Sequence, residues 1–410
     1  VTALFMNRMG RDRNSISADL LCGGDPGRVC SIGCGLSDRH RGGQSVYKVT
    51  FENGASVGYK PKDLSIDRAF NALIDWMAAD GAPASAGTVK VSPRGGYGWV
   101  EWVAHAPCTD EEEARRFFHR SGAMLCLIRM LQGNDFHFEN VVARGQVPVP
   151  IDLETITHPR IKEVEPELES ESAFFKTMYQ LGDSVASVGY LPNYIPVPGG
   201  GAAKVGGLDD YDELDAAQHV DAPANAGEGF NPNLPSLNGR PLSVMHYEAD
   251  LLAGYREMFA YIDRNGARIA AAGGPLDMFE NCLIRPVLRA TRLYAMIQHR
   301  SLARRAVVDG AAWSAEFDML ARISAAADGQ DPMLTLCHYE RKAMAVFDIP
   351  FYQASTSSRD LICGDGEVIT DFFEAPCLDT VRTRFKNVPK DALPRDEVLI
   401  ERSLRKGDQP

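Results

Sequence analysis

Three polar residues around one short hairpin have the types and spacing that phosphoryl transfer requires. Asp135 is followed five positions later by Asn140, and Asp152 comes after a short span that can form a hairpin. In kinases such residues orient the acceptor hydroxyl and bind Mg²⁺ on the nucleotide phosphates. We therefore interpret Asp135 as the residue that orients and deprotonates the hydroxyl, and Asn140 and Asp152 as metal ligands. An ordinary polar loop would match the same pattern, so the interpretation depends on the rest of the chain.

A strand-rich segment precedes these residues and ends in a lysine. Strands are expected over 28–35, 46–52 and 55–60, and Asn53-Gly54 is a strong hairpin signal between the last two. Lys60 ends the third strand. A kinase lysine that reaches the nucleotide phosphates occupies the same position. An exposed strand lysine is the alternative reading.

The loop between the first two strands would cover the nucleotide phosphates. It carries Asp38 and His40, which we interpret as contacts to the nucleotide, its metal or the acceptor, since a carboxylate alone would repel phosphate. A helix is expected over 65–79. It offers Asp67 but no Glu, so the usual lysine–glutamate pair of kinases is not visible.

Further strands over 89–91 and 99–103 lead to a long helix. Thr109 and Glu112 have the spacing of a capping box, with Thr109 as the N-cap. The apolar residues that follow predict a largely buried helix towards Leu131, and a buried helix would hold the Asp135 loop rigidly.

Composition excludes several classes of protein. The chain has 410 residues, a net charge of −12 and no apolar run of membrane-spanning length, so neither a nucleic-acid partner nor a transmembrane segment is expected. The nine scattered cysteines predict reduced thiols in a cytoplasmic protein, with a zinc site at Cys30 and Cys34 as the weaker alternative. The start at Val1 suggests a fragment or a trimmed chain.

The second half is expected to be helical over 247–265, 283–300 and 313–327. On the second of these helices Arg285, Arg289 and Arg292 would share one broad face. Such a face is often merely solvated. The preceding stretch, 158–240, has acidic and Pro/Gly-rich runs that predict a flexible insertion in the place of an activation segment.

Five motifs together resemble the dehydratase domain of class II lanthipeptide synthetases, the LanM type. They are Ser37-Asp38-Arg39-His40, Tyr59-Lys60-Pro61, Tyr97-Gly98-Trp99-Val100-Glu101, Asn134 to Asn140, and Pro150 to Thr155. The resemblance implies a lipid-kinase-like core that uses ATP and Mg²⁺ to phosphorylate Ser and Thr of a precursor peptide and then eliminates the phosphate. It also implies that His137 assists Asp135, and that Glu154, Arg285 and Thr291 serve the later chemistry.

The chain departs from this family in ways that limit the expectation. Ser37 stands where Gly is common, and neither the N-terminal helical portion nor the zinc-dependent cyclase domain is present, so a separate or fused cyclase would form the rings. The segment Asp348 to Phe351 also matches a family stretch and is interpreted as packing.

The expected architecture is an α+β, two-lobed fold like that of lipid and protein kinases. A small β-rich N-lobe would span 1–107, the central helix with its catalytic and metal loops 108–157, the insertion 158–240, and a larger helical C-lobe 241–410. Two alternatives stay open. A kinase without elimination would need Lys60, Asp135, Asn140 and Asp152 but not Arg285 or Thr291, and a pseudokinase would only bind a peptide.

Overall fold

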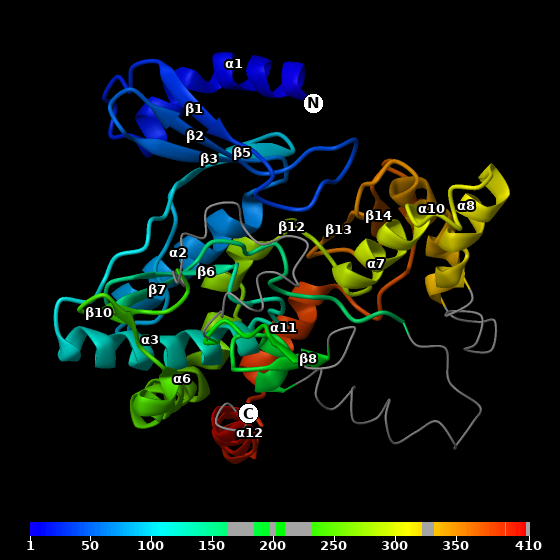
Figure 1. Ribbon diagram of the computed structural model, residues 1–410. Helices are drawn as coiled ribbons and strands as arrows, with labels where there is room; N and C mark the ends of the chain where they lie inside the picture. The colour runs from blue at the N-terminus through cyan, green and yellow to red at the C-terminus, as the bar shows by residue number, and fades with distance from the viewer. Residues whose placement is uncertain (163–183, 197–201, 210–231, 322–331, 390, 407–410) are drawn as a thin grey trace, which may run out of the picture.

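The computed structural model describes residues 1–162, 184–196, 202–209, 232–321, 332–389 and 391–406. A five-stranded antiparallel sheet lies at one end of the molecule, and a larger, mainly helical part lies beneath it (Figure 1). The sheet order is β1-β2-β3-β5-β4, with the strands β1 (Val29–Gly33), β2 (Tyr47–Phe51), β3 (Ser56–Lys60), β4 (Val91–Arg94) and β5 (Tyr97–Glu101).

The sheet is covered on one face by α1 (Thr2–Leu20), which forms a separate small core with it. Phe5 of α1 packs edge-on against Tyr59 of β3, with ring centroids 5.2 Å apart. Trp99 of β5 is completely buried and packs against both rings. The strand that ends in Lys60 is therefore held in place by an aromatic cluster.

The predicted strands of the sheet can be compared with its two hairpins, β2–β3 and β4–β5. The β2–β3 hairpin turns at Gly54, whose φ of +83° is the left-handed conformation that glycine adopts readily. The predicted strands there are confirmed. In the β4–β5 hairpin the predicted strand bounds are wrong: Pro93–Arg94 and Tyr97–Gly98 pair within the ladder, so only Gly95-Gly96 forms the turn.

Two long helices follow the predicted pattern closely. The helix α2 (Ser65–Ala79) has the predicted bounds, and α3 (Glu111–Met130) is largely buried, as its apolar sequence indicates. The predicted N-cap of α3 is wrong by one residue. Asp110, not Thr109, accepts the N–H of Glu113 at 2.8 Å, and Glu113 returns a bond by accepting the N–H of Thr109 at 2.7 Å. The Asp110 carboxylate thus caps the helix, in place of the Thr109 hydroxyl that was predicted to do so.

The core of the helical part is the crossing of α3 with α6 (Glu248–Ile269). Glycines lie at the contact on both helices. A Cβ on Gly122 would come within 1.9 Å of the Leu251 carbonyl oxygen, and one on Gly254 within 1.8 Å of that of His119. Backbone therefore meets backbone at this crossing, which fixes the helix that leads into the Asp135 loop.

The remaining elements surround this crossing. The hairpin β6 (Val141–Arg144) and β7 (Val147–Pro150) follows the Asp135 loop, and a small sheet of order β12-β13-β14-β15 lies further along the chain. Its strands are Leu283–Ile284, Tyr352–Ser355, Leu361–Cys363 and Val368–Ile369. The described chain also forms short strands and helices, which are η1 (Val185–Val188), β8 (Tyr194–Pro196), β9 (Ala202–Lys204), β10 (Ser236–Leu237), β11 (Arg240–Pro241), η2 (Val244–Tyr247), η3 (Pro275–Phe279), α7 (Thr291–Ser301), α8 (Gly310–Phe317), η4 (Pro332–Leu336), α10 (Cys337–Met344), α11 (Cys377–Lys386) and α12 (Ala392–Lys406).

The predicted helix over 283–300 is wrong in its first half. Residues 283–284 form β12, and the helix α7 begins only at Thr291. Pro286 explains the difference, because proline disfavours a helical conformation in the residue before it and donates no N–H. The helix predicted over 313–327 is interrupted at Asp318: α8 ends at Phe317, residues 319–321 are helical again, and the remaining residues lie outside the described part of the chain, as does most of the 158–240 insertion.

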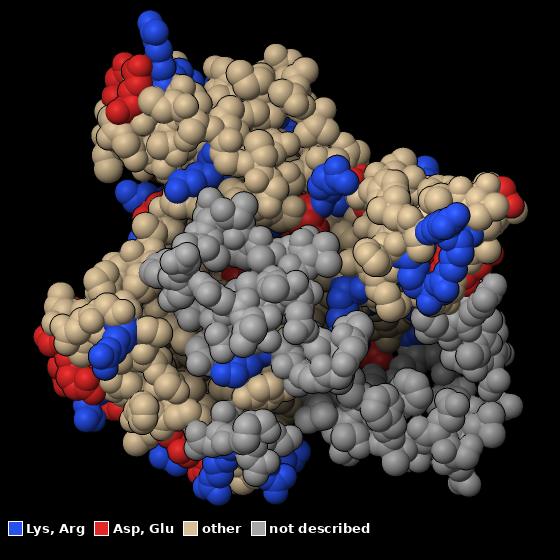
Figure 2. Space-filling view, in the orientation of Figure 1, with Lys and Arg blue, Asp and Glu red and all other residues tan. Residues whose placement is uncertain are grey.

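The surface charges, the cysteines and the hydropathy of the helices can be compared with the expectations from composition. On the face seen in Figure 2, lysine and arginine side chains lie in separate patches among acidic ones. None of the nine cysteines forms a disulfide. No helix within the described ranges combines the length and the apolar character that a bilayer crossing needs.

Candidate functional site

The loop between α3 and β6 presents three of the predicted residues together. Asp135 has a left-handed backbone with φ of +65°, which is uncommon outside glycine and is a feature of functional loops. Nε2 of His137 lies 3.6 Å from Oδ1 of Asp135. The Asn140 side-chain amide donates to the Asp135 carbonyl at 2.8 Å and lies 3.2 Å from the His137 Nε2. The backbone of the loop thus gathers Asp135, His137 and Asn140 at one place.

The Asp135 carboxyl is accessible to a substrate, and its pKa is raised. Its side chain is 45% exposed, so a substrate can reach it. Surrounding protein nevertheless removes part of its hydration, and this desolvation raises the pKa, opposed by the charges of His137 and Arg285. A carboxyl of this kind holds a proton more readily than a free one, which suits a residue that must accept a proton from a hydroxyl.

The second predicted carboxylate, Asp152, follows β7. It pairs with Lys62, which was not among the predicted site residues. Lys62 Nζ donates to Asp152 Oδ1 and lies 2.7 Å from Oε2 of Glu154. Burial would lower the pKa of Lys62, but the charges of Asp152 and Glu154 raise it above its usual value. Lys62 therefore stays a cation between the two carboxylates.

A weak signal for Lys62 was present in the sequence. Lys62 lies two residues beyond Lys60, and residues two apart on an extended strand face the same side. The pattern alone could not say which of the two lysines would meet the carboxylates.

Lys60 itself lies directly beside this cluster. It is 7% exposed, and its Nζ donates to the carbonyl oxygen of Ile151, the residue before Asp152. The charge of Lys60 also acts on Asp67 of α2, whose pKa is raised, because burial outweighs the two lysines nearby. Asp67 Oδ2 has no hydrogen-bond partner among the described residues. Asp67 is therefore a buried carboxyl on which the charges of both Lys60 and Lys62 act.

Arg285 joins the site from the distant segment after β12. Its guanidinium donates to Oε1 of Glu154 at 2.8 Å, and its backbone N–H donates to the Glu154 carbonyl oxygen at 2.7 Å. Burial would raise the pKa of Glu154, but Lys62 and Arg285 outweigh it and hold this pKa well below its usual range. Glu154 is thus an anion held between two cations.

The reading of three arginines on one helical face is wrong. Arg285 and Arg289 precede α7, and Arg289 pairs with the fully buried Glu340 at 2.8 Å rather than facing solvent. Arg292 lies on α7 and is exposed. Of the three, only Arg285 contacts the acidic cluster.

His40 and Asp38 lie on the Arg285 side of the site. Desolvation, followed by the charge of Arg285, lowers the pKa of His40 to about 4, and Glu154 and Lys62 also act on it electrostatically. The charge of Asp38 is among those that raise the pKa of Arg285. The loop expected to cover phosphates therefore borders the Glu154–Arg285 pair.

Thr291 is the first residue of α7. The contacts and charges described above bring the other nine predicted residues into one region, whereas Thr291 is placed only by its position at the start of this helix. Its predicted role stays a prediction.

The ligand types at Asn140 and Asp152 fit Mg²⁺. The Asn140 side chain uses its nitrogen for Asp135, which leaves its oxygen available, and Mg²⁺ prefers amide and carboxylate oxygens. Among the described residues no group of three or more His, Cys, Asp or Glu side chains could hold a metal ion by itself. Nucleotide phosphates and water would have to complete such a coordination shell, as is usual for Mg²⁺.

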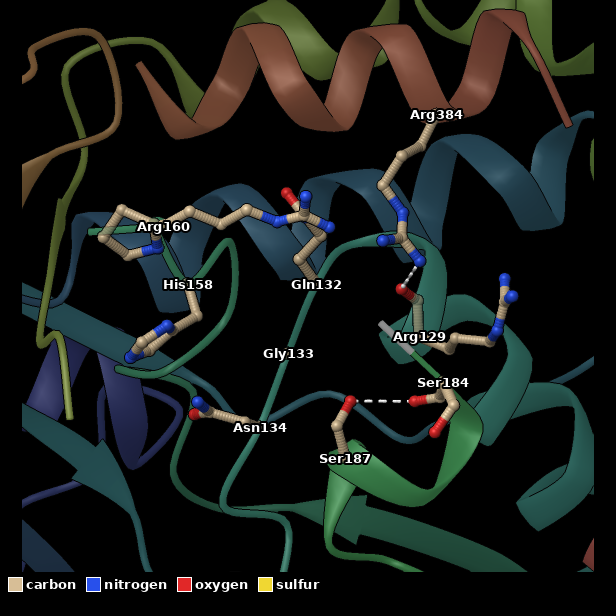
Figure 3. Close-up of a pocket in the computed structure, with 10 residues that line it drawn as sticks. Arg129, Gln132, Gly133, Asn134, His158, Arg160, Ser184, Ser187 and Arg384 are labelled. Carbon is tan, nitrogen blue, oxygen red and sulfur yellow. Dashed lines mark hydrogen bonds between the residues drawn. The ribbon is translucent and has the colours of Figure 1, made fainter. Parts of the chain in front are cut away.

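A separate pocket of about 230 Å³ opens behind the same loop (Figure 3). Asn134 lines it, together with residues that include Arg129, Arg160, Arg384 and His158. Arg129 pairs with Asp396 at 2.8 Å, and Arg384 donates to the Arg129 carbonyl oxygen at 2.9 Å. All three arginines are thus engaged within the protein, and none of the ten predicted residues lines the pocket.

The fold and the site define a mixed α/β protein whose antiparallel sheet and helical part meet at a cluster of carboxylates bridged by Lys62 and Arg285. The chain belongs to the family described as Domain of unknown function (DUF4135), which it matches over residues 1–355. It is also similar to the lacticin 481/lactococcin biosynthesis protein LcnDR2 of Lactococcus lactis subsp. lactis, with 33% identity over 163 residues. That match covers 38% of this chain and spans only 17% of the length of the relative. The resemblance to class II lanthipeptide synthetases is thereby confirmed.

Proposed function

We propose that this chain is the dehydratase part of a lanthipeptide synthetase, with a kinase-like fold, and that it phosphorylates Ser and Thr of a precursor peptide and then eliminates the phosphate. The observation that carries the proposal is that Arg285 pairs with Glu154 beside Asp152 and the Asp135 loop, although Arg285 lies 131 residues after Glu154 in the sequence. The similarity to a lacticin 481/lactococcin biosynthesis protein supports a role in maturing such a peptide.

In the first step the hydroxyl of a substrate Ser or Thr attacks the γ-phosphorus of ATP, and ADP leaves. Asp135 would orient the hydroxyl and accept its proton, with His137 beside it. Lys60 and Lys62 supply positive charge next to Asp152, where the nucleotide phosphates would lie. When bound, Mg²⁺ would neutralise phosphate charge, held by Asn140 and Asp152.

In the second step a base takes the proton from Cα of the phosphorylated residue, the electron pair of that C–H bond forms the Cα=Cβ double bond, and the Cβ–O bond breaks so that phosphate departs with the bonding electrons. Arg285 suits the departing group, because a planar guanidinium can bind two phosphate oxygens together. Glu154 holds Arg285 through two hydrogen bonds, one to its side chain and one to its backbone. Such a preorganised cation stabilises developing charge without rearranging. Thr291 would assist from the start of α7.

A kinase without elimination is the second candidate. The ion pair between Arg285 and Glu154 favours the dehydratase, because a simple kinase would not need a buried arginine turned towards the same cluster. The two candidates differ in their product: dehydrated peptide for the dehydratase and phosphopeptide for the kinase.

The test is a search of the neighbouring open reading frames for a short Ser/Thr/Cys-containing precursor peptide, coexpression of that peptide with this chain, and mass spectrometry of the product. The dehydratase predicts peptides lighter by one water per modified residue, and none with Asp135→Asn. Peptides heavier by phosphate alone would establish the second candidate instead. An unmodified peptide with the unaltered chain, in the presence of ATP and Mg²⁺, would contradict both.

A further inference from the structure

A buried carboxylate from the far end of the chain holds the loop that carries Asp38 and His40. Oδ2 of Asp348 accepts the N–H of Gly42 at 2.6 Å, and Oδ1 accepts the N–H of Gly43 at 3.0 Å. Asp348 is only 4% exposed. Burying a charge is costly unless donors meet it, so these N–H groups are what allow the carboxylate to remain there.

The glycines make this arrangement possible. Gly42 and Gly43 have φ values of +82° and +81°, which side-chain-bearing residues rarely adopt. The N–H groups of both residues donate to the same carboxylate, as successive N–H groups in a turn do when they form a concave site for an anion. Asp348 fills that site from within the protein.

The residues after Asp348 extend the contact to His40. The N–H of Ile349 donates to the Arg39 carbonyl oxygen at 2.8 Å, and the Ile349 carbonyl oxygen lies 2.8 Å from His40 Nδ1. A carbonyl can only accept, so Nδ1 carries the hydrogen and Nε2 of the neutral ring keeps its lone pair. The Phe351 ring packs against His40 and lies beneath the Arg41 guanidinium.

We propose that Asp348 is a positioning residue, which fixes the Gly42-Gly43 turn and thereby orients His40 and Asp38 towards Arg285 and Glu154. The interpretation of Asp348 to Phe351 as packing alone is therefore incomplete, because its polar contacts set the loop. The reaction concerned rests on the proposed function, whereas the contact itself can be tested without it.

Trypsin provides the test that needs no substrate, since Arg39 and Arg41 lie in the loop. In Asp348→Ala, cleavage after these arginines should be at least about five-fold faster than in the unaltered chain, because released loops open more often. Asp365→Asn, a surface carboxylate of the same region that pairs with Lys342, is the control and should leave the rate unchanged. Should the Ala variant not fold, Asp348→Asn keeps the shape and one acceptor, and a rise of about two-fold is expected. Unchanged cleavage in the folded variants would overturn the proposal.

A double-mutant cycle tests the positioning role with the precursor peptide. Asp348→Asn should slow dehydration by about ten-fold, and adding it to His40→Ala should slow that variant by no more than about two-fold, because both changes act through one side chain. Losses that multiply would show that Asp348 acts independently of His40 and overturn the role. If the unaltered chain dehydrates no peptide, the proposed function fails. The trypsin experiment still shows whether Asp348 holds the Gly42-Gly43 turn.

Discussion

Lys62 and Glu154 form an ion pair with 2.7 Å between Nζ and Oε2, and both side chains are almost excluded from water. Lys62→Met should leave Asp152 and Glu154 without their shared cation, and breaking a buried pair typically costs about 3–5 kcal/mol. We expect a loss of that order in the free energy of unfolding, measured with urea at pH 7. Lys90→Met, at an exposed lysine, is the matched control and should change it by less than about 0.5 kcal/mol. Equal stabilities of the two variants would show that Lys62 is not needed to hold the carboxylates.

Acid should destabilise the fold through buried neutral histidines. Burial lowers the pKa of His158 to about 4, and its Nε2 accepts the N–H of Val287 at 2.9 Å. Because the unfolded chain binds the proton near pH 6.5, stability is lost as the pH falls from about 6.5 to 4, by up to about 3 kcal/mol for this group. His158→Gln should flatten that part of the stability curve in urea titrations. His299→Gln, at an exposed histidine of α7, should leave its shape unaltered.

Replacing Arg285 should separate the two proposed steps. Arg285→Lys keeps a positive charge near Glu154 but cannot hold two phosphate oxygens in one plane. We expect phosphopeptide to accumulate and dehydrated peptide to fall by about 100-fold, a loss comparable to that of one oxyanion donor. Arg292→Lys, on the exposed side of α7, serves as the comparison and should give dehydrated peptide only. An Arg285→Lys variant with the normal product would remove this arginine from the elimination step.

The helix crossing beneath the site should tolerate no side chain at Gly254. A Cβ there would lie 1.8 Å from the His119 carbonyl oxygen, so α3 and α6 would have to separate. We expect Gly254→Ala to cost on the order of 2–4 kcal/mol, seen as a lower unfolding temperature. Gly10→Ala in α1 is the control, because nothing lies within 4 Å of its Cβ position. It should stabilise the chain by about 0.5–1 kcal/mol. Equal effects of the two changes would contradict the close crossing.

Local patterns predicted those elements whose signals are local. The helix 65–79 alternates buried and exposed residues at helical spacing, and Asn53-Gly54 specifies its own turn, so both are confirmed. The prediction of a helix over 283–300 is wrong in its first half. The apolar residues there have helical spacing, but Pro286 disfavours a helical backbone in the residue before it, and α7 begins only at Thr291. The α3 cap was misplaced because Thr109 and Asp110 are both good N-caps, and the geometry selects Asp110.

The site was predictable as a set of residues but not as a set of contacts. Asp135, Asn140 and Asp152 lie in one short span, so their proximity follows from the chain itself. Lys62 and Asp348 could not be assigned in the same way. Their partners are 90 and 306 residues away, and no local pattern specifies which lysine or carboxylate will reach them.

The long separation between Gly42 and Asp348 has a consequence for synthesis on the ribosome. The loop emerges early, but its carboxylate follows 306 residues later. At about 5–20 residues per second, the nascent loop waits roughly 15 to 60 s for its partner. During this interval the sheet can already have folded around α1, whereas Asp38 and His40 are not yet held in place. The Asp38–Gly43 loop therefore reaches its final arrangement late in translation, well after its own residues have left the ribosome.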